Sequence, residues 1–392
     1  MSKKKIMEKS SVRLMLDLSS IKSGGGAQLA LNFIHAVRKN EFPIPIQMIL
    51  LPKGFPFQNS IPKDIEVITC PNAPASRILF EYTKLKSIVR ERGINTFYTF
   101  FGPGLPRYSN VRSVVGVAYP ILVYPESSYW KHIPTKEALA KKIQNYLRGA
   151  RLKHADHIIF ETALMEQRAR AAGIVSNDSS IVPPYPTTFL NSSPPPDFRT
   201  HGARILFLSG PAQHKNLWRL PGIFTALKRE NLAVKFLLSM DRQRFIDHCS
   251  VNGVEVHPKL LEEFCDFLGP LAQDNLQAAF DQCNVVGNIA DLESFSNNYL
   301  EAWLTSRPIL ASDRDFARNI CGDSAIYVDP HDPDSLLEGI RCFATGKLDF
   351  SAIVSAGASA LGRLPSRQAR LNALAQVIDG HGTAAAQVDP SV

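Results

Sequence analysis

The residues from Asp291 to Asp313 read DLESFSNNYLEAWLTSRPILASD, and they follow the apolar run NVVGNIA at 284–290. A short apolar run of this kind predicts a buried strand, and the residues PILA at 308–311 predict a second one. Between them, Glu293 falls in the loop where the first strand ends, and Glu301 falls in the first turn of a helix. Strand, helix and strand in this order predict a parallel sheet with helices on both faces.

The same alternation extends over both halves of the 392-residue chain. In the first half we expect strands near 12–18, 46–51, 65–68, 96–101, 111–117 and 157–160, with helices near 27–38, 76–92 and 162–172. In the second half we expect strands near 204–209, 234–239, 265–268, 284–289, 308–311 and 325–328, with helices near 217–230, 273–282 and 332–343. The sequence therefore predicts an α/β protein with two Rossmann-like, doubly wound domains.

A proline-rich stretch from Pro183 to Gly202 separates the two halves, because prolines and neighbouring serines exclude a long helix there. In chain order we expect a first domain, a linker, a second domain, a C-terminal helix that packs back on the first domain, and a disordered tail, at 1–190, 191–202, 203–350, 351–379 and 380–392. Two such domains predict an interdomain cleft, since ligands of these sheets bind beyond the carboxyl ends of the strands.

The composition, with 45% hydrophobic and 20% charged residues, is typical of a soluble globular protein. No apolar run reaches the roughly 18 residues of a transmembrane helix, and the basic start MSKKKIMEK lacks the apolar stretch of a signal peptide. The six cysteines are scattered without a Cys-x-x-Cys pair, which argues against a zinc site and favours the cytoplasm. The net charge of +8 predicts anionic partners.

Part of the positive charge lies in the region Lys131–Lys153, where Tyr146 and Leu147 interrupt a cluster of basic residues. Its members are Lys136, Lys141, Lys142, Arg148, Arg151 and Lys153. One interpretation is a solvated helix face, and the other is contact with an anionic membrane, which would place the protein on the inner face of the plasma membrane. We expect no nucleic-acid partner, because no DNA- or RNA-binding signature accompanies the charge.

A glycine loop at Gly24–Gly26 follows the first strand and precedes a helix, which is the context of a phosphate-binding loop. The alternative is a flexible surface turn. The loop is not a Gly-x-Gly-x-x-Gly fingerprint, because Leu29 takes the third glycine position. The second strand also ends at Leu51-Pro52-Lys53 without an acidic residue for a ribose, so a nicotinamide enzyme is not favoured.

Lys215 lies in the corresponding loop of the second half, SGPAQHKN at 209–216, just before a predicted helix. A lysine near the positive end of a helix dipole is unfavourable unless an anion joins it, which points to a diphosphate. The alternative is an ordinary surface lysine, with Asn216 as the N-cap of that helix.

The two carboxylates suit vicinal hydroxyl groups of a sugar or ribose, because each accepts hydrogen bonds in pairs. In the alternative interpretation, Glu293 is a surface loop residue. The spacing of Asn298 and Glu301 is then that of a capping box, so that Glu301 would serve only its own helix.

These stretches resemble the nucleotide-binding domain of family 4 (glycosyl transferases group 1) retaining glycosyltransferases, which have the GT-B fold. The stretch from Glu293 to Glu301 is similar to the family's Glu-x7-Glu motif, and CGDSAIYVDP at 321–330 to its closing signature. The glycines at 24–26 are similar to the family's loop near the donor phosphates.

The resemblance implies a metal-independent, retaining hexosyltransferase without a cofactor, which moves a sugar from a nucleotide sugar to a hydroxyl of a saccharide or lipid-linked acceptor. It implies that the first domain is the acceptor-side domain, that the second binds the nucleotide sugar, and that the protein acts in surface polysaccharide or lipopolysaccharide biosynthesis. Glu293 would be the catalytic residue near the donor sugar, Lys215 would contact the diphosphate, and Glu301 would hold the ribose. The other implied donor-binding residues are Gly25, Gly26, Ser294, Phe295, Ser296, Asn297 and Asn298.

The chain departs from the family pattern at three places. Ser294 and Ser296 stand where the family has glycines, Pro211 stands where it commonly has an arginine, and no histidine is evident in GVAYP at 116–120. Two alternatives therefore stay open: a sugar-nucleotide epimerase or hydrolase of the same fold, and a catalytically inactive nucleotide-sugar-binding protein.

Overall fold

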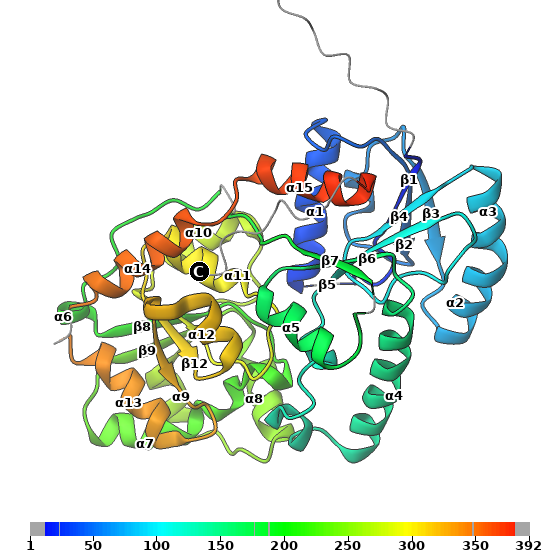
Figure 1. Cartoon of the computed structure of the whole chain (residues 1–392). Coiled ribbons are helices and arrows are strands. Elements are labelled where there is room, and N and C mark those ends of the chain that lie inside the picture. The colour runs from blue at the N-terminus through cyan, green and yellow to red at the C-terminus, as the bar shows by residue number, and fades with distance from the viewer. Residues whose placement is uncertain (1–11, 23, 176, 187–188, 347–348, 381–392) are drawn as a thin grey trace, which may run out of the picture. The chain divides into compact units, whose positions relative to one another are not determined.

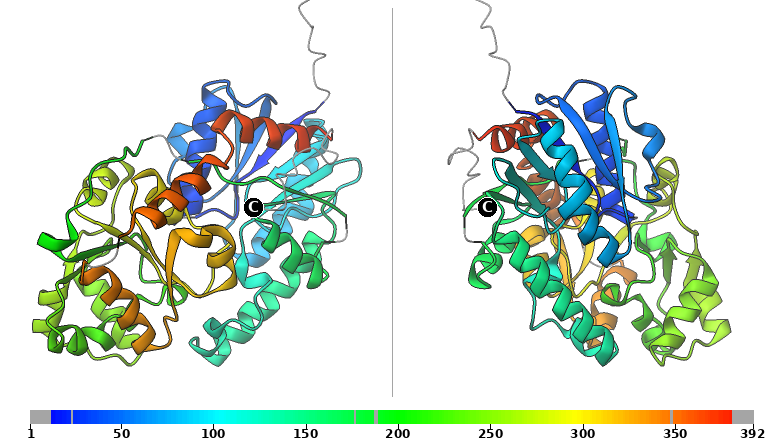
Figure 2. Two further views of the ribbon diagram at one scale, coloured as in Figure 1. Left: turned by 60° about the vertical axis from the view of Figure 1, so that its left-hand side comes forward. Right: turned by 90° about the vertical axis from the view of Figure 1, so that its right-hand side faces the viewer.

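The computed structural model describes residues 12–22, 24–175, 177–186, 189–346 and 349–380 (Figure 1). The chain divides into two compact units. The first comprises residues up to 123, 140–184 and 365 onward, and the second comprises 124–139 and 185–364. Each unit is an α/β domain with its own parallel sheet, as the alternation in the sequence predicts. Figure 2 shows the helices of each unit packed beside its own sheet.

The sheet of the first unit has seven parallel strands in the order β3-β2-β1-β4-β5-β6-β7. The strands are β1 (Leu14–Asp17), β2 (Ile46–Pro52), β3 (Glu66–Cys70), β4 (Thr96–Thr99), β5 (Arg112–Val117), β6 (His157–Phe160) and β7 (Asp178–Ile181). The helices of this unit are α1 (Gly24–Arg38), α2 (Pro74–Phe80), α3 (Lys86–Glu91), α5 (Ala163–Ala171), α15 (Arg367–Asp379) and, from residue 140 on, α4 (Thr135–Leu152). The core joins strand residues such as Leu16 and Tyr98 to Phe33 of α1 and Leu374 of α15.

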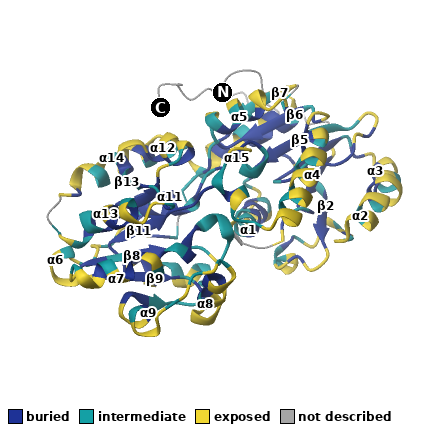
Figure 3. Cartoon of the chain, turned by 90° about the horizontal axis from the view of Figure 1, so that it is seen from below, coloured by how far each residue is buried: buried dark blue, intermediate teal, exposed yellow. Residues whose placement is uncertain are grey.

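The sheet of the second unit has six parallel strands in the order β10-β9-β8-β11-β12-β13. The strands are β8 (Ala203–Phe207), β9 (Val234–Leu238), β10 (Cys265–Phe267), β11 (Val285–Asn288), β12 (Ile309–Ser312) and β13 (Ala325–Val328). The helices are α6 (Phe198–His201), α7 (Pro221–Arg229), α8 (Arg242–Val251), α9 (Pro258–Phe264), α10 (Leu276–Phe280), α11 (Asn297–Leu304), α12 (Asp315–Cys321), α13 (Pro333–Ala344) and α14 (Ser351–Gly362). Figure 3 shows the buried strands of both units and the exposed outer sides of their helices.

In each sheet the strand order reverses direction beside the strand that comes first in the chain. The candidate site of the second unit lies at this point of reversal. In the second unit, β8 lies between β9 and β11, so the chain leaves β8 toward one side of the sheet and returns at β11 on the other. The loops that follow two such neighbouring strands diverge from the same edge of the sheet, where ligands of α/β folds bind. Those two loops carry Lys215 and Glu293.

The structure corrects the sequence analysis at the start of α1. The glycines at 24–26 are not a loop before a helix from about residue 27, because α1 begins at Gly24. The φ angles of Gly25 and Gly26 are not positive, so the backbone at these two residues does not use the conformational freedom of glycine. The edge strand β7 was also not predicted. Its four residues, Asp-Ser-Ser-Ile, have only one apolar side chain and give no strand pattern.

The C-terminal region differs from the predicted single helix over 351–379. It forms α14 and α15, which are separated by a break at Pro365, a residue that cannot donate to a helical hydrogen bond. The helix α14 belongs to the second unit and packs on α11, whereas α15 belongs to the first. Residues 124–139, expected in the first domain, also belong to the second unit. The predicted disordered tail lies outside the described residues, apart from Gly380.

Within the described part of the chain, every helix is too short or too polar to cross a membrane.

Candidate functional site

The site in the second unit is built around an ion pair between the Lys215 ammonium group and the Glu293 carboxylate. Lys215 ends a 3-10 turn, Gln213–Lys215, in the loop after β8, and Glu293 lies in the loop after β11. The side chains are 18% and 14% exposed, so both reach solvent although most of their surface is covered. The structure therefore brings together two residues that the sequence analysis selected 78 positions apart.

Asn216 holds these two loops together. It adopts a left-handed conformation, with φ of 58°, which turns the chain directly after Lys215. Its side chain is buried, and Nδ2 donates to the carbonyl oxygen of Ile289 at 3.0 Å. It occupies the N-cap position of a 3-10 turn, Leu217–Arg219, as one interpretation expected, but its side chain makes no cap bond to that turn.

Glu301 is a buried carboxyl group without a partner. It is the fifth residue of α11, beyond the first turn where the sequence analysis placed it. The N-cap of α11 is Ser296, so a capping box would need the glutamate at position 299, and the capping-box interpretation is wrong. No hydrogen bond or ion pair to its carboxyl group occurs among the described residues, and burial raises the pKa of Glu301 to about 8. A buried acceptor in this state is suited to a ligand with hydroxyl groups.

The residues between the two glutamates form the N-terminal end of α11. Ser294 and Ser296 are buried, and the Ser296 hydroxyl makes no bond to the helix that it precedes. Neither serine has a positive φ, so the backbone conformation here does not require the glycines of the resembling family. Phe295 and Asn297 are half-buried, and Asn298 donates through Nδ2 to the Leu208 carbonyl at 3.5 Å. The first N–H groups of α11 thus lack a side-chain cap and could face an anion.

Gly25 and Gly26, also predicted to bind the donor, lie in the first unit at the start of α1. They do not belong to the unit that carries Lys215, Glu293 and Glu301.

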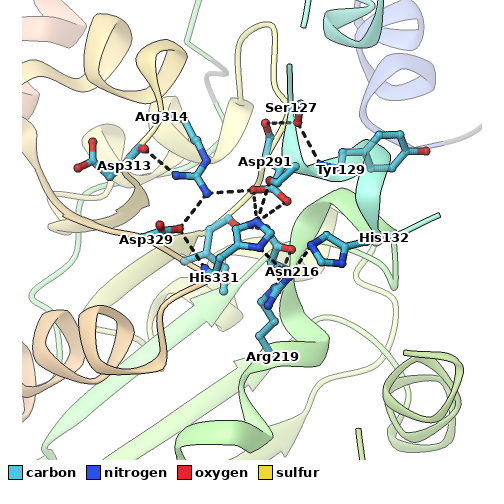
Figure 4. Close-up of polar contacts among 12 residues, drawn as sticks. Ser127, Tyr129, His132, Asn216, Arg219, Asp291, Asp313, Arg314, Asp329 and His331 are labelled. Carbon is cyan, nitrogen blue, oxygen red and sulfur yellow. Dashed lines mark hydrogen bonds and ion pairs between the residues drawn. The ribbon is translucent and has the colours of Figure 1, made fainter. Parts of the chain in front are cut away.

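Sequence reasoning missed a polar network centred on Asp291, two residues before Glu293 (Figure 4). The Asp291 carboxylate is buried, and it accepts from His331 Nε2 at 2.8 and 2.9 Å and from Arg314 Nη2 at 3.3 Å. Burial by itself raises the pKa of Asp291, but the hydrogen bonds and charges of His331, Asn216 and Arg314 outweigh it and hold this pKa below its usual value. These contacts therefore favour the ionised form of Asp291 although it is buried.

The same network fixes the tautomer of His331. Arg219 donates through Nη2 to His331 Nδ1 at 2.7 Å, and a guanidinium group cannot accept, so the proton of a neutral His331 lies on Nε2. The Ser128 hydroxyl lies 2.9 Å from that same Nε2 atom. Because Ser128 and Asp291 share one ring nitrogen, the three residues are not a nucleophilic triad, which needs a different nitrogen for each partner.

The segment 124–139 contacts this network through His132. Its ring stacks on His331 with centroids 5.1 Å apart, and its Nε2 lies 3.0 Å from Arg219 Nη2. Burial, followed by the charge of Arg219, lowers the pKa of His132 and keeps the ring neutral. In the sequence, the only signals were the closeness of Asp291 to Glu293 and of Arg219 to Lys215.

Among the residues that the structure describes, no group of three or more His, Cys, Asp or Glu side chains is arranged to hold a metal ion.

Neither a protein-family model nor a curated protein sequence matches the chain. Its fold is similar to that of solved glycosyltransferases at low sequence identity. The sucrose-phosphate synthase of Thermosynechococcus elongatus aligns with a TM-score of 0.69 and 15% identity, over 93% of this chain and 98% of that one. Anabaena HepE in complex with UDP has a TM-score of 0.65 and 16% identity, over 94% and 100%. WaaG, a glycosyltransferase involved in lipopolysaccharide biosynthesis, has a TM-score of 0.65 and 14% identity, over 94% and 100%. The GT-B-like fold predicted from the sequence is thereby confirmed.

Proposed function

We propose that this chain is a glycosyltransferase that moves a sugar from a nucleotide-sugar donor to a hydroxyl acceptor, with retained anomeric configuration and without a metal. The observation that carries the proposal is the Lys215–Glu293 pair at the switch point of the second sheet, followed by the unpartnered carboxyl group of Glu301. The solved structure of HepE with UDP-glucose, at 15% identity and a TM-score of 0.64, supports a nucleotide-sugar donor.

Each residue has a role that its chemistry allows. The Lys215 ammonium group and the free N–H groups of α11 stabilise the negative charge that develops on the departing diphosphate, and they do so without a metal ion. Glu301 accepts hydrogen bonds from the ribose hydroxyls of the nucleotide. Glu293 lies at the donor sugar as the catalytic residue. During the reaction the bond from the anomeric carbon to the diphosphate breaks, a bond from that carbon to the acceptor oxygen forms, and the proton of the acceptor hydroxyl passes to the departing diphosphate.

The donor screen is the first test. Thermal shift with UDP-, GDP-, ADP- and CMP-sugars reports binding, because a ligand of the native state raises the melting temperature. The strongest donor is then incubated with a panel of saccharide and lipid-linked acceptors. Release of nucleoside diphosphate only when an acceptor is present supports transfer, and release without an acceptor indicates a hydrolase. Tight binding without any turnover indicates an inactive binding protein. NMR of the product decides retention, and unchanged activity in EDTA is expected.

We further propose that the acceptor pathway is surface polysaccharide or lipopolysaccharide synthesis, with the protein held in the cytoplasm on the inner face of the plasma membrane by the region Lys131–Lys153. The helix α4 exposes a set of large apolar side chains that a soluble surface does not need. They are Leu139, Ile143, Tyr146 and Leu147, which are 54–78% exposed. Lysines interleaved with such residues are typical of a helix that lies on an anionic lipid surface.

The structure refines the variants for that test. Arg151 forms an ion pair with Glu81 at 2.7 Å, and Arg148 lies 4.7 Å from the ring centre of Tyr119, so replacing either residue would also remove an intramolecular contact. The lysine variant is Lys136→Gln, at an exposed position of α4, and the apolar variant is Ile143→Ser/Leu147→Ser. Both are measured by co-sedimentation with vesicles that contain anionic lipid, and binding that neither variant reduces argues against the membrane contact.

A further inference from the structure

We infer that Asp291 is a positioning residue for the Lys215–Glu293 pair. This inference rests on the proposed function for its ligand, a nucleoside diphosphate, but its geometry can be tested without one. Asp291 is not placed in contact with the ligand itself. Asp291 acts by fixing the two loops that carry Lys215 and Glu293, and these two residues contact the ligand.

The backbone of Asp291 provides the first link. Its N–H donates to the carbonyl oxygen of His214 at 2.7 Å, and His214 directly precedes Lys215. On the other side, only Leu292 separates Asp291 from Glu293. Asp291 is thus hydrogen-bonded to the loop of Lys215 and lies in the same loop as Glu293. A shift of Asp291 would therefore change the separation of the two charges.

The side chain of Asp291 provides the second link, because it holds the residue in place from several directions (Figure 4). Arg314, from the loop after β12, and His331, from the loop after β13, both donate to its carboxylate. Arg219 then connects His331 back to the Lys215 loop, since its Nε lies 3.3 Å from Asn216 Oδ1. The bonds form a closed circuit that returns to the residue next to Lys215.

Asparagine at position 291 would weaken this circuit with little change in volume. Its amide oxygen can still accept from Arg314 and His331 at the position of Oδ1, but an NH₂ group replaces Oδ2, which accepts from His331 at 2.9 Å, and this places a donor opposite a donor. The negative charge that balances Arg314 and Arg219 is also lost. The matched control is Asp329→Asn. Asp329 accepts from the same Arg314 at 2.9 Å and from the His331 backbone N–H at 3.0 Å, but it is 47% exposed and has no bond to the Lys215 loop.

The test is a double-mutant cycle on the dissociation constant of UDP, or of the diphosphate that the donor screen selects. We expect Asp291→Asn to weaken binding on the order of tenfold in the wild-type background and to have little further effect in Lys215→Ala, since both changes remove the same interaction. Asp329→Asn should change binding less than twofold in either background. A change that only destabilises the fold would reduce binding by the same factor with and without Lys215. Equal factors, or an Asp291→Asn protein that binds normally, overturn the inference.

A crystal structure of Asp291→Asn without ligand separates this inference from the proposed function. We expect Lys215 and Glu293 to move apart there, and a pair that stays in contact overturns the positioning role. If the wild-type protein binds no nucleoside diphosphate while Asp291→Asn still separates the pair, then the proposed function fails and the positioning role stands.

Discussion

Glu293 neutralises Lys215, because the two side chains form an ion pair while both remain more than four-fifths covered. A diphosphate that binds Lys215 has to compete with this carboxylate. Substitutions of Lys215 and of Glu293 should therefore have different effects on diphosphate binding: the first weakens it and the second does not. A general loss of structure would weaken binding in both variants.

Lys215→Ala should weaken the binding of a nucleoside diphosphate by about tenfold or more, since a charge-assisted contact in a poorly hydrated site is lost. Binding of the nucleoside alone should change little. Titration calorimetry with UDP and uridine measures both. The matched control is Lys228→Ala, which removes a lysine that is 58% exposed and paired with Glu263 in the same unit. An equal loss for UDP and uridine would contradict the assignment of Lys215 to the phosphates.

Glu293→Gln should bind the nucleoside diphosphate at least as tightly as the wild type, because it removes the charge that competes for Lys215 while the Asp291 bonds still hold the Lys215 loop in place, unlike in Asp291→Asn. The same substitution should abolish most of the transfer activity if Glu293 is the catalytic residue. Calorimetry and a turnover assay on one preparation give both numbers. Weaker binding together with normal turnover is the opposite pattern, and it would remove Glu293 from the proposed role.

Glu301 gives a prediction for the pH dependence of stability. Burial raises the pKa of Glu301 from 4.5 to about 8. The folded state therefore binds more protons at this group than the unfolded state between these two values. Its contribution to the free energy of unfolding is fully present below about pH 4.5 and is lost as the pH rises through 8. Glu301→Gln, which stays neutral, should gain a few degrees in melting temperature relative to wild type at pH 8.5, and little at pH 5.

Thermal melts of both proteins across this range, without ligand, test the assignment. A melting-temperature difference that does not depend on pH would mean that Glu301 is already ionised in the folded protein at neutral pH.

We expect Ser296, at the start of α11, to contribute to ligand binding more than to the stability of the fold. Ser296 is the N-cap of α11, yet its hydroxyl makes no cap bond, so Ser296→Ala should cost less than about 0.5 kcal/mol of stability. Thr162 is the matched control. Its hydroxyl accepts from the Met165 N–H at 3.2 Å as the N-cap of α5, so Thr162→Ala should cost about 1 kcal/mol. Urea unfolding compares the two. Donor affinity should fall in Ser296→Ala and not in Thr162→Ala.

The sequence was sufficient to predict which site residues lie close together when their positions follow from the order of the strands. Lys215 and Glu293 each come directly after a strand of an alternating pattern, and the ends of neighbouring parallel strands meet at one edge. The Asp291 network was out of reach because its members come from distant loops: Ser128 and His331 are 203 positions apart and no local pattern links them. The capping-box interpretation of Glu301 failed for a local reason, since the spacing cannot show at which residue the helix begins.

The packing of α14 on α11 depends on a glycine, Gly357, and this contact can be tested by substitution. A Cβ atom at Gly357 of α14 would lie 2.5 Å from Cδ1 of Trp303 in α11, so the Trp303 ring or α14 would have to shift to admit it. Alanine is normally the better helix former by about 1 kcal/mol, yet Gly357→Ala should destabilise the protein by about 1–3 kcal/mol because it overpacks this contact. Gly362, in the same helix, is the control, since a Cβ there meets no atom within 4 Å. Gly362→Ala should be neutral or slightly stabilising. Urea unfolding of both variants measures the difference, and a Gly357→Ala protein as stable as the wild type would mean that α14 does not lie against Trp303.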